Sequence, residues 1–196
     1  MDTEKLNLSK TPTRKALAMV EFSSVASGIM ALDIITKTAE VDILAAQIIC
    51  PGKYLVIFCG RLSSVNASLE AARKVPYQID EFLLGSPHPD IFPALSGAAH
   101  LHEKAALGLI ETYSGAAAIK AADSAAKTAW INLAEIRISH GMCGKSTIIF
   151  TGELAGVAAA LEAAKKEASE NGKLMDTALI PSPDAKMLAA MARHNP

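Results

Sequence analysis

The chain has 196 residues, of which 51% are hydrophobic and only 5% are aromatic. Its 19 lysines and arginines nearly balance its 20 aspartates and glutamates, so the formal net charge is −1. This balance excludes a strongly basic nucleic-acid-binding protein and provides no polybasic signal for anionic membranes. The apolar content excludes intrinsic disorder of the whole chain. The longest uncharged stretch, Ile91–His102, is too short to span a bilayer.

The N-terminal segment MDTEKLNLSKTPTRK lacks the apolar core of a signal peptide, so we expect a cytoplasmic protein with reduced thiols. Residues 1–14 are polar and are predicted to form a flexible tail. The three cysteines, Cys50, Cys59 and Cys143, are an odd number and provide no disulfide framework. Without paired CxxC or HxxxH ligands they also predict no zinc site within one chain.

The next segments alternate between strand and helix patterns. The pattern predicts, in chain order, a strand at Ala16–Phe22, a helix at Val25–Thr38 capped by Ser23-Ser24, a strand at Val41–Ile49, a turn at Cys50–Lys53, a strand at Tyr54–Cys59, a helix at Leu62–Val75 and a short strand at Phe82–Gly85. The order β-α-β-β-α-β is that of the ferredoxin-like α/β sandwich, in which one face of the sheet is covered by two helices. The alanine-rich helices allow close approach within and between domains.

The second half of the chain repeats the first. ALAMVE at residues 16–21 returns as ALGLIE at residues 106–111, and LEAARK at residues 69–74 returns as LEAAKK at residues 161–166. The matches are collinear, and their offset grows from 90 to 94 residues through small insertions. We therefore predict an α/β (α+β) protein of two tandem domains, at residues 15–102 and 103–196, produced by duplication. Glu21 and Glu111 stand at matching strand ends, and we interpret them as structural because duplication explains the coincidence.

Two copies of this pattern resemble the bacterial microcompartment (BMC) shell domain. The resemblance is carried by ALAMVEF, ALDIITKTAEVDIL, CPGKYLVIFCG and LEAARK in the first copy and by ALGLIET, AADSAAKTAWINL, GMCGKSTIIFTG and LEAAKK in the second. It covers nearly the whole chain after residue 14. Tandem domains in unpermuted order resemble the trimeric shell proteins, which implies a homotrimer whose six domains form a pseudohexameric tile. The resemblance therefore implies a structural protein of a compartment shell within the cytoplasm.

The resemblance extends to a propanediol-utilisation subtype that carries a [4Fe–4S] cluster at the centre of the tile. In that subtype one cysteine from each chain, in an Ile-Cys-Pro-Gly-Lys turn, binds the cluster, and the matching residue here is Cys50. One cluster per trimer would then lie on the three-fold axis and serve electron transfer or redox sensing across the shell. The second turn departs from the subtype because Cys143 stands where glycine is expected, which places a further thiol near the pore.

The resemblance also assigns residues to the pore and to the edge of the tile. The residues expected to line the pore are Cys50, Pro51, Gly52, Met142, Cys143 and Gly144. Lys37 and Lys127 match the lysine that packs tile against tile, which is the role we expect; the alternative for each is a solvated lysine at a helix end, where it favours the helix dipole. Cys59, within an apolar strand, is expected to be a buried hydrophobic residue.

The expected partners are further copies of the chain, other shell proteins and a redox enzyme. We expect no catalytic activity, because the chain has no glycine-rich phosphate loop, Ser/His/Asp set or HExxH motif. Two alternatives stay open. The first is a tile without a cluster, whose pore conducts metabolites or cofactors. The second is a ferredoxin-like regulator or enzyme with a ligand between its domains.

Overall fold

The computed structural model describes residues 15–96, 105–139, 141–170 and 172–193, so the predicted tail and the predicted boundary at residues 102–103 lie outside the described residues. The first repeat contains, in chain order, β1 (Ala16–Phe22), α1 (Val25–Thr38), β2 (Asp42–Ile49), β3 (Lys53–Gly60), α2 (Leu62–Ala72), β4 (Gln78–Leu84) and α3 (Ile91–Leu95). The second contains β5 (Ala106–Thr112), α4 (Gly115–Thr128), β6 (Ile131–Ile138), β7 (Ser146–Gly152), α5 (Leu154–Glu170), β8 (Leu174–Ile180) and α6 (Ala185–Arg193).

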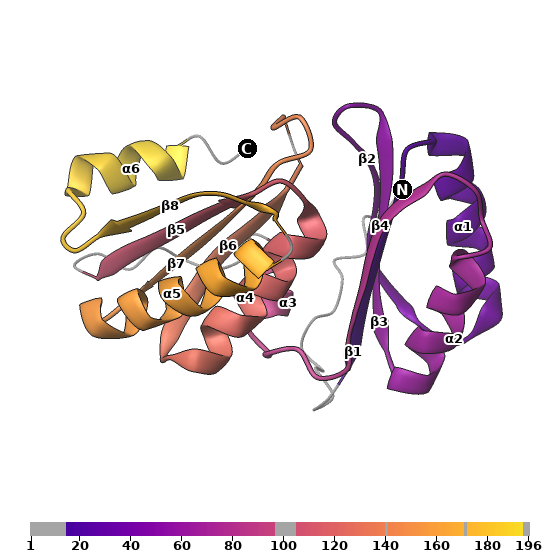
Figure 1. The fold of residues 1–196 in the computed structure, drawn as a ribbon, viewed down its shortest axis with the longest axis horizontal. Helices are drawn as coiled ribbons and strands as arrows, with labels where there is room; N and C mark the ends of the chain where they lie inside the picture. Colours follow the sequence, from indigo (N-terminus) through magenta and orange to yellow (C-terminus); the bar gives the residue numbers. More distant parts are fainter. Residues whose placement is uncertain (1–14, 97–104, 140, 171, 194–196) are drawn as a thin grey trace, which may run out of the picture.

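Each repeat forms one antiparallel sheet of four strands, ordered β2-β3-β1-β4 in the first and β6-β7-β5-β8 in the second. This is the predicted ferredoxin-like order, and the two sheets share their register: Ala16 pairs with Gly60, and Ala106 pairs with Gly152. Figure 1 shows α1 and α2 on one face of the first sheet, and α4 and α5 on one face of the second. The fold is therefore α+β with two tandem domains.

Local sequence explains where the helices begin. Ser24 precedes α1, and its hydroxyl accepts a hydrogen bond from the backbone N–H of Ser27 at 3.4 Å. Ser114 precedes α4, and its hydroxyl accepts from the N–H of Ala117 at 3.2 Å. Both serines thus satisfy a backbone donor that the first turn of the helix leaves free.

The structure corrects three details of the predicted elements. Helix α2 ends at Ala72 instead of Val75, because Pro76 cannot continue the backbone hydrogen bonds of a helix. Strand β4 begins at Gln78 instead of Phe82, since pairing with β1 starts where Gln78 faces Phe22. The short helices α3 and α6 follow β4 and β8 and were not predicted.

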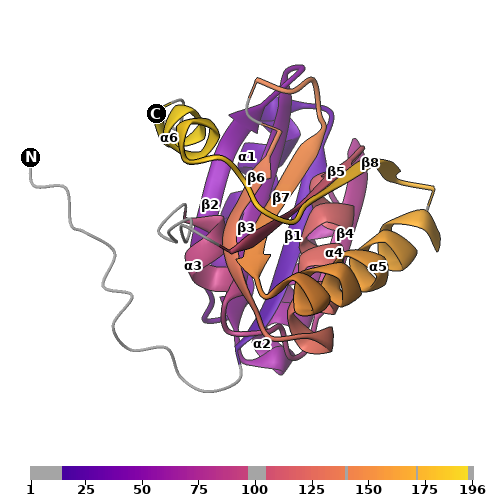
Figure 2. The same cartoon turned by 90° about the vertical axis from the view of Figure 1, so that its left-hand side faces the viewer.

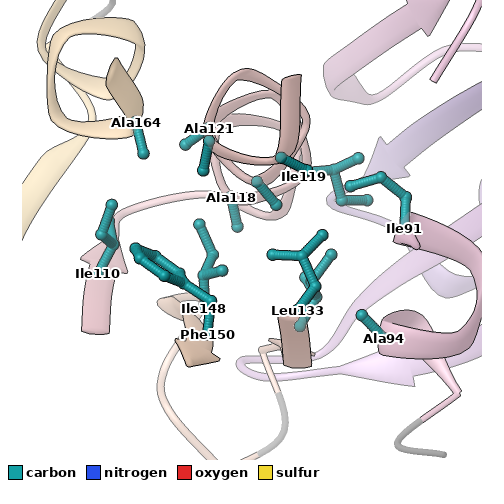
Figure 3. Close-up of a cluster of buried hydrophobic side chains, with 14 of the residues drawn as sticks. Ile91, Ala94, Ile110, Ala118, Ile119, Ala121, Leu133, Ile148, Phe150 and Ala164 are labelled. Atoms are coloured by element: carbon teal, nitrogen blue, oxygen red, sulfur yellow. The ribbon is translucent and has the colours of Figure 1, made fainter. Parts of the chain in front are cut away.

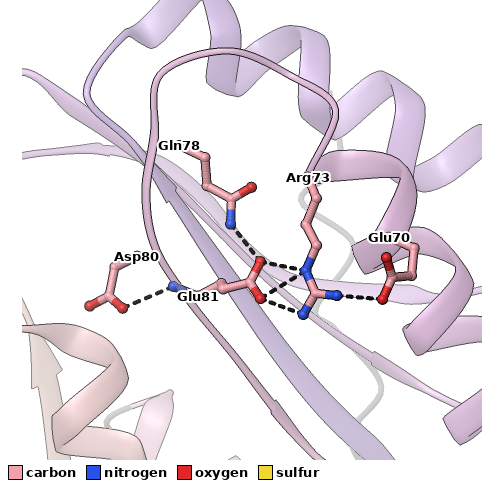
Figure 4. Close-up of polar contacts among 5 residues, drawn as sticks. All are labelled: Glu70, Arg73, Gln78, Asp80 and Glu81. Carbon is pink, nitrogen blue, oxygen red and sulfur yellow. Dashed lines mark hydrogen bonds and ion pairs between the residues drawn. The ribbon is translucent and has the colours of Figure 1, made fainter. Parts of the chain in front are cut away.

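An ion-pair network ties α2 to β4. The guanidinium of Arg73 donates from Nε to both carboxylate oxygens of Glu81, at 2.8 and 3.0 Å, and also pairs with Glu70 (Figure 4). The side-chain amide of Gln78 donates to the same Glu81 carboxylate. These hydrogen bonds from Arg73 are the main reason that the pKa of Glu81 lies below its ordinary value.

Two hydrophobic clusters form the core. The first lies between the first sheet and α1 and α2, where Phe22, Phe58, Ile35 and Leu69 are fully buried. The second fills the second domain and continues into the first (Figure 3). Alanines such as Ala121 and Ala164 face each other between α4 and α5, as expected for close packing of alanine-rich helices.

The first sheet is buried on both faces, so the prediction that one face is covered by two helices is incomplete for this domain. Its second face carries Leu17, Met19 and Phe82 into the cluster of the second domain. There the start of α4 and the end of β6 cover it: a Cβ placed on Gly115 would lie 3.5 Å from Sδ of Met19 and 2.7 Å from Cγ2 of Ile138. None of the helices that the structure describes is long and apolar enough to cross a membrane.

Candidate functional site

The first candidate pore turn joins β2 to β3 through Cys50, Pro51 and Gly52. Cys50 is partly exposed, and Gly52 has a φ of 77°, a conformation that glycine adopts without the steric cost of a side chain. The ICPGK sequence thus places one accessible thiol at the tip of a hairpin.

The second candidate turn joins β6 to β7. The N–H of Lys145 donates to the carbonyl of Met142 at 3.0 Å, which closes the turn around Cys143 and Gly144. Cys143 is exposed and has a φ of 52°, while Gly144 has a φ of 89°. Glycine would suit position 143 better, so Cys143 holds an exposed thiol at some cost in backbone energy.

The structure brings these two turns together. A Cβ placed on Gly144 would lie 3.7 Å from the carbonyl oxygen of Cys50 and 3.6 Å from Nζ of Lys53. Figures 1 and 2 both show the β2–β3 and β6–β7 hairpins at the same end of the molecule. The predicted pore-lining residues of the two domains therefore belong to one surface.

A lysine next to each turn forms an ion pair with the glutamate of the neighbouring strand. The sequence pattern singled out the two glutamates but did not predict these lysine partners. Nζ of Lys53 lies 2.6 Å from Glu21, which is buried, and Nζ of Lys145 lies 2.5 Å from Glu111. The hydrogen bond that the Lys145 ammonium donates to Glu111 is the main reason that the pKa of Lys145 is raised. The repeat contained the signal, since glutamate and lysine recur together in both copies. The structural interpretation of both glutamates agrees with these ion pairs.

The third cysteine has a different environment. Cys59 is 2% exposed within β3, and burial raises the pKa of its thiol, so it is a buried hydrophobic residue as predicted. Among the described residues, no group of three or more histidine, cysteine, aspartate or glutamate side chains could hold a metal ion within one chain.

The two predicted edge lysines occupy matching helix ends but differ in their surroundings. Lys37 pairs with Asp33 at 2.7 Å, and its side chain is 74% exposed. Lys127 pairs with Asp123 at 2.5 Å. Asp123 is buried, and its carboxylate also accepts a hydrogen bond from the backbone N–H of His88 in the first domain, at 2.7 Å. The same motif thus faces solvent in one domain and supports the domain interface in the other.

Comparison with known proteins identifies the family. The BMC domain profile matches residues 16–87 and 106–183, which together are most of the chain. The chain belongs to the family of bacterial microcompartment shell proteins. It is 31% identical over 179 residues to the shell protein PduT of Citrobacter freundii, covering 90% of this chain and 97% of that one.

Solved structures agree with this assignment to the shell proteins. A microcompartment protein from Desulfitobacterium hafniense DCB superposes with a TM-score of 0.84 at 41% identity, covering 91% of this chain and 98% of that one. A fused permuted hexameric shell protein from the RMM microcompartment superposes with a TM-score of 0.62 at 18% identity, covering 82% and 87%, and shares the fold. This shell protein is accordingly structural and not catalytic, and it functions in the shell of a bacterial microcompartment.

Proposed function

We propose that three copies of this shell protein form a ring-shaped tile, and that Cys50 of each copy binds one shared [4Fe–4S] cluster at the centre. The observation that supports a ring is the interface between the two domains of one chain. The interface between the two domains uses a surface of the second domain whose duplicate in the first domain is exposed.

The paired isoleucines Ile138 and Ile48 illustrate this asymmetry. They occupy the same ladder position, since Ile138 pairs with Ser146 and Ile48 with Tyr54, immediately after the turn lysine in each hairpin. Ile138 is 5% exposed and belongs to the hydrophobic cluster that also contains Met19 of the first domain, whereas Ile48 is 62% exposed. A second copy that covers Ile48 as the first domain covers Ile138 would remove this apolar surface from water.

The fifth residues of α1 and α4 repeat the pattern. Ile119 of α4 is fully buried and points toward Ile91 of α3 in Figure 3, whereas its counterpart Ile29 in α1 is 53% exposed. Both exposed isoleucines, Ile48 and Ile29, lie in the first domain. The surface that they form is therefore the one expected to receive the second domain of another copy.

Repetition of such a head-to-tail interface produces either a closed ring or an open filament. A closed ring of six domains, which is three chains of this length, would satisfy this interface at every domain. In that ring the hairpin turns at Cys50–Gly52 and Met142–Gly144 face the common axis as the lining of the pore.

The residues at the first turn fit a cluster shared between chains. Cysteine thiolates are the usual ligands of iron–sulfur clusters. Each chain offers the partly exposed Cys50 in its first hairpin turn, in addition to the exposed Cys143 in its second. The absence of a ligand group among the described residues of one chain means that such a cluster would need ligands from several copies. When bound, it would supply one-electron transfer, and Cys50 is the residue that would hold it. The similarity to PduT supports the assignment of the chain to a microcompartment shell, which is the setting that this proposal requires.

Iron analysis of protein purified without oxygen tests the cluster. We expect iron and inorganic sulfide in the wild-type trimer and their loss in Cys50→Ser, read by metal analysis and electron paramagnetic resonance. Cys143→Gly is the matched control, because glycine suits the φ of 52° and removes only the neighbouring thiol. Intact wild-type trimers without iron after reconstitution would favour the tile that conducts metabolites, and retained iron in Cys50→Ser would reject Cys50 as the ligand.

A further inference from the structure

Trp130 is the only tryptophan of the chain, and it is 99% exposed. It stands between α4 and β6, three residues after Lys127. Its backbone packs closely against the end of β7 and the start of α5, since a Cβ on Gly152 or Gly156 would lie 3.3 Å from the Trp130 carbonyl oxygen. A fully exposed indole on a closely packed backbone is unusual, because tryptophan is normally well buried.

Trp130 is one of the residues that line a shallow pocket of about 370 Å³. Its lining residues are Ala105, Trp130, Ile131, Asn132, Thr151 and Gly152. They lie where β6 begins and β7 ends, which is the opposite end of the hairpin from the turn at Met142–Gly144. An eight-residue strand spans about 26 Å, so a tile with the turns at its axis carries this pocket toward its perimeter.

In the first domain, a lysine occupies the position that corresponds to this pocket. At the positions of Ala105 and Asn132 that domain has Lys15 and Asp42, and Nζ of Lys15 lies 2.5 Å from the Asp42 carboxylate. This hydrogen bond is the main reason that the pKa of Lys15 is raised. The corresponding place in the first repeat therefore holds a charged lysine from within the chain, whereas the second repeat has alanine at that position and an open pocket.

We infer that the Trp130 pocket binds an exposed lysine of a neighbouring tile, and that in layers of this protein alone the lysine is Lys37 of another copy. This inference rests on the proposed tile. An indole face attracts an ammonium group, and the apolar stem of lysine suits the wall of the pocket. Lys37 is suited to this role because its side chain is 74% exposed. It also lies in the last turn of α1, far from the Cys50 turn.

The two edges are complementary because of this difference between repeats. The first domain presents the exposed Lys37 and has Glu40 in place of tryptophan, while the second presents Trp130 and the open pocket. A contact between unlike edges is heterologous and continues from tile to tile. The difference between Lys15 in the first repeat and Ala105 in the second thus gives the layer a direction that identical edges would lack.

Because Trp130 is the sole tryptophan, its fluorescence reports on this contact directly. We expect its emission to move to shorter wavelength, and acrylamide quenching to fall, when purified trimers assemble into layers that are followed by light scattering and electron microscopy. Lys37→Ala should abolish the emission shift and raise the protein concentration needed for assembly by about tenfold, as expected for loss of a central aromatic contact. Lys37→Arg should restore both, since arginine keeps the cation.

Trp130→Ala and the matched variant Glu40→Ala complete the test. Trp130→Ala should weaken assembly about as strongly as Lys37→Ala, and Glu40→Ala should leave it within about twofold of wild type. Layers that form with unchanged Trp130 emission would overturn this inference and leave the tile intact, as would an unaltered shift in Lys37→Ala. A chain that forms no trimer would overturn the proposed tile, and with it this contact.

Discussion

The exposed Ile48 allows the proposed ring to be tested with one substitution and an internal control. Complete burial of an isoleucine side chain contributes about 1.5–3 kcal/mol. Because 62% of Ile48 is exposed in the single chain, covering it would contribute about 1–2 kcal/mol at each interface. Ile48→Ala removes most of that area, so a trimer with three such interfaces should lose about 3 kcal/mol.

The assay separates association from folding. A loss of about 3 kcal/mol corresponds to an increase of roughly 100-fold in the dissociation constant of the trimer, which sedimentation over a range of urea and protein concentrations can measure. The folding of the dissociated chain should change little, since exposed substitutions usually cost less than about 0.5 kcal/mol.

Ile138→Ala is the matched control, because Ile138 has the same ladder position but is 5% exposed. It should lower the free energy of unfolding of the chain itself by about 2–5 kcal/mol. The reasoning fails if Ile48→Ala trimers dissociate at the wild-type urea concentration, or if both variants destabilise the single chain equally. Either result would mean that the internal interface is not repeated between chains.

Three further substitutions test individual contacts. Because Arg73 lowers the pKa of Glu81, their ion pair stabilises the fold above the ordinary carboxyl pKa, and this contribution is lost as the pH falls through the lowered value. Glu81→Gln should therefore weaken the acid dependence of thermal stability, and an unchanged dependence would contradict the assignment. Gly28→Ala places a Cβ 2.4 Å from Cβ of Tyr54 and should cost about 1–3 kcal/mol in urea unfolding, whereas wild-type stability would show that α1 and β3 move apart at little cost. Cys143→Gly relieves a positive φ and should keep or raise stability, by about 1 kcal/mol at most, in the same assay.

The sequence alone was sufficient to predict the repeat, the strand order and the position of the Cys50 hairpin. These features depend on local patterns: continuous apolar strands, Ser24 before a helix, and Gly52 in a tight turn. Duplication strengthened each interpretation, because the same pattern had to be explained twice. The family resemblance rested on these same motifs, and the comparisons confirm it.

Tertiary structure decided how the two copies differ. The burial of Met19 beneath the second domain and the approach of Gly144 to Cys50 depend on contacts between residues about 90 positions apart, which no local pattern encodes. The open pocket beside Trp130 likewise appears only when three strand ends meet. Repeats of one pattern encode two domains of the same fold, but only their packing determines which copy of each surface is covered and which is left for a partner.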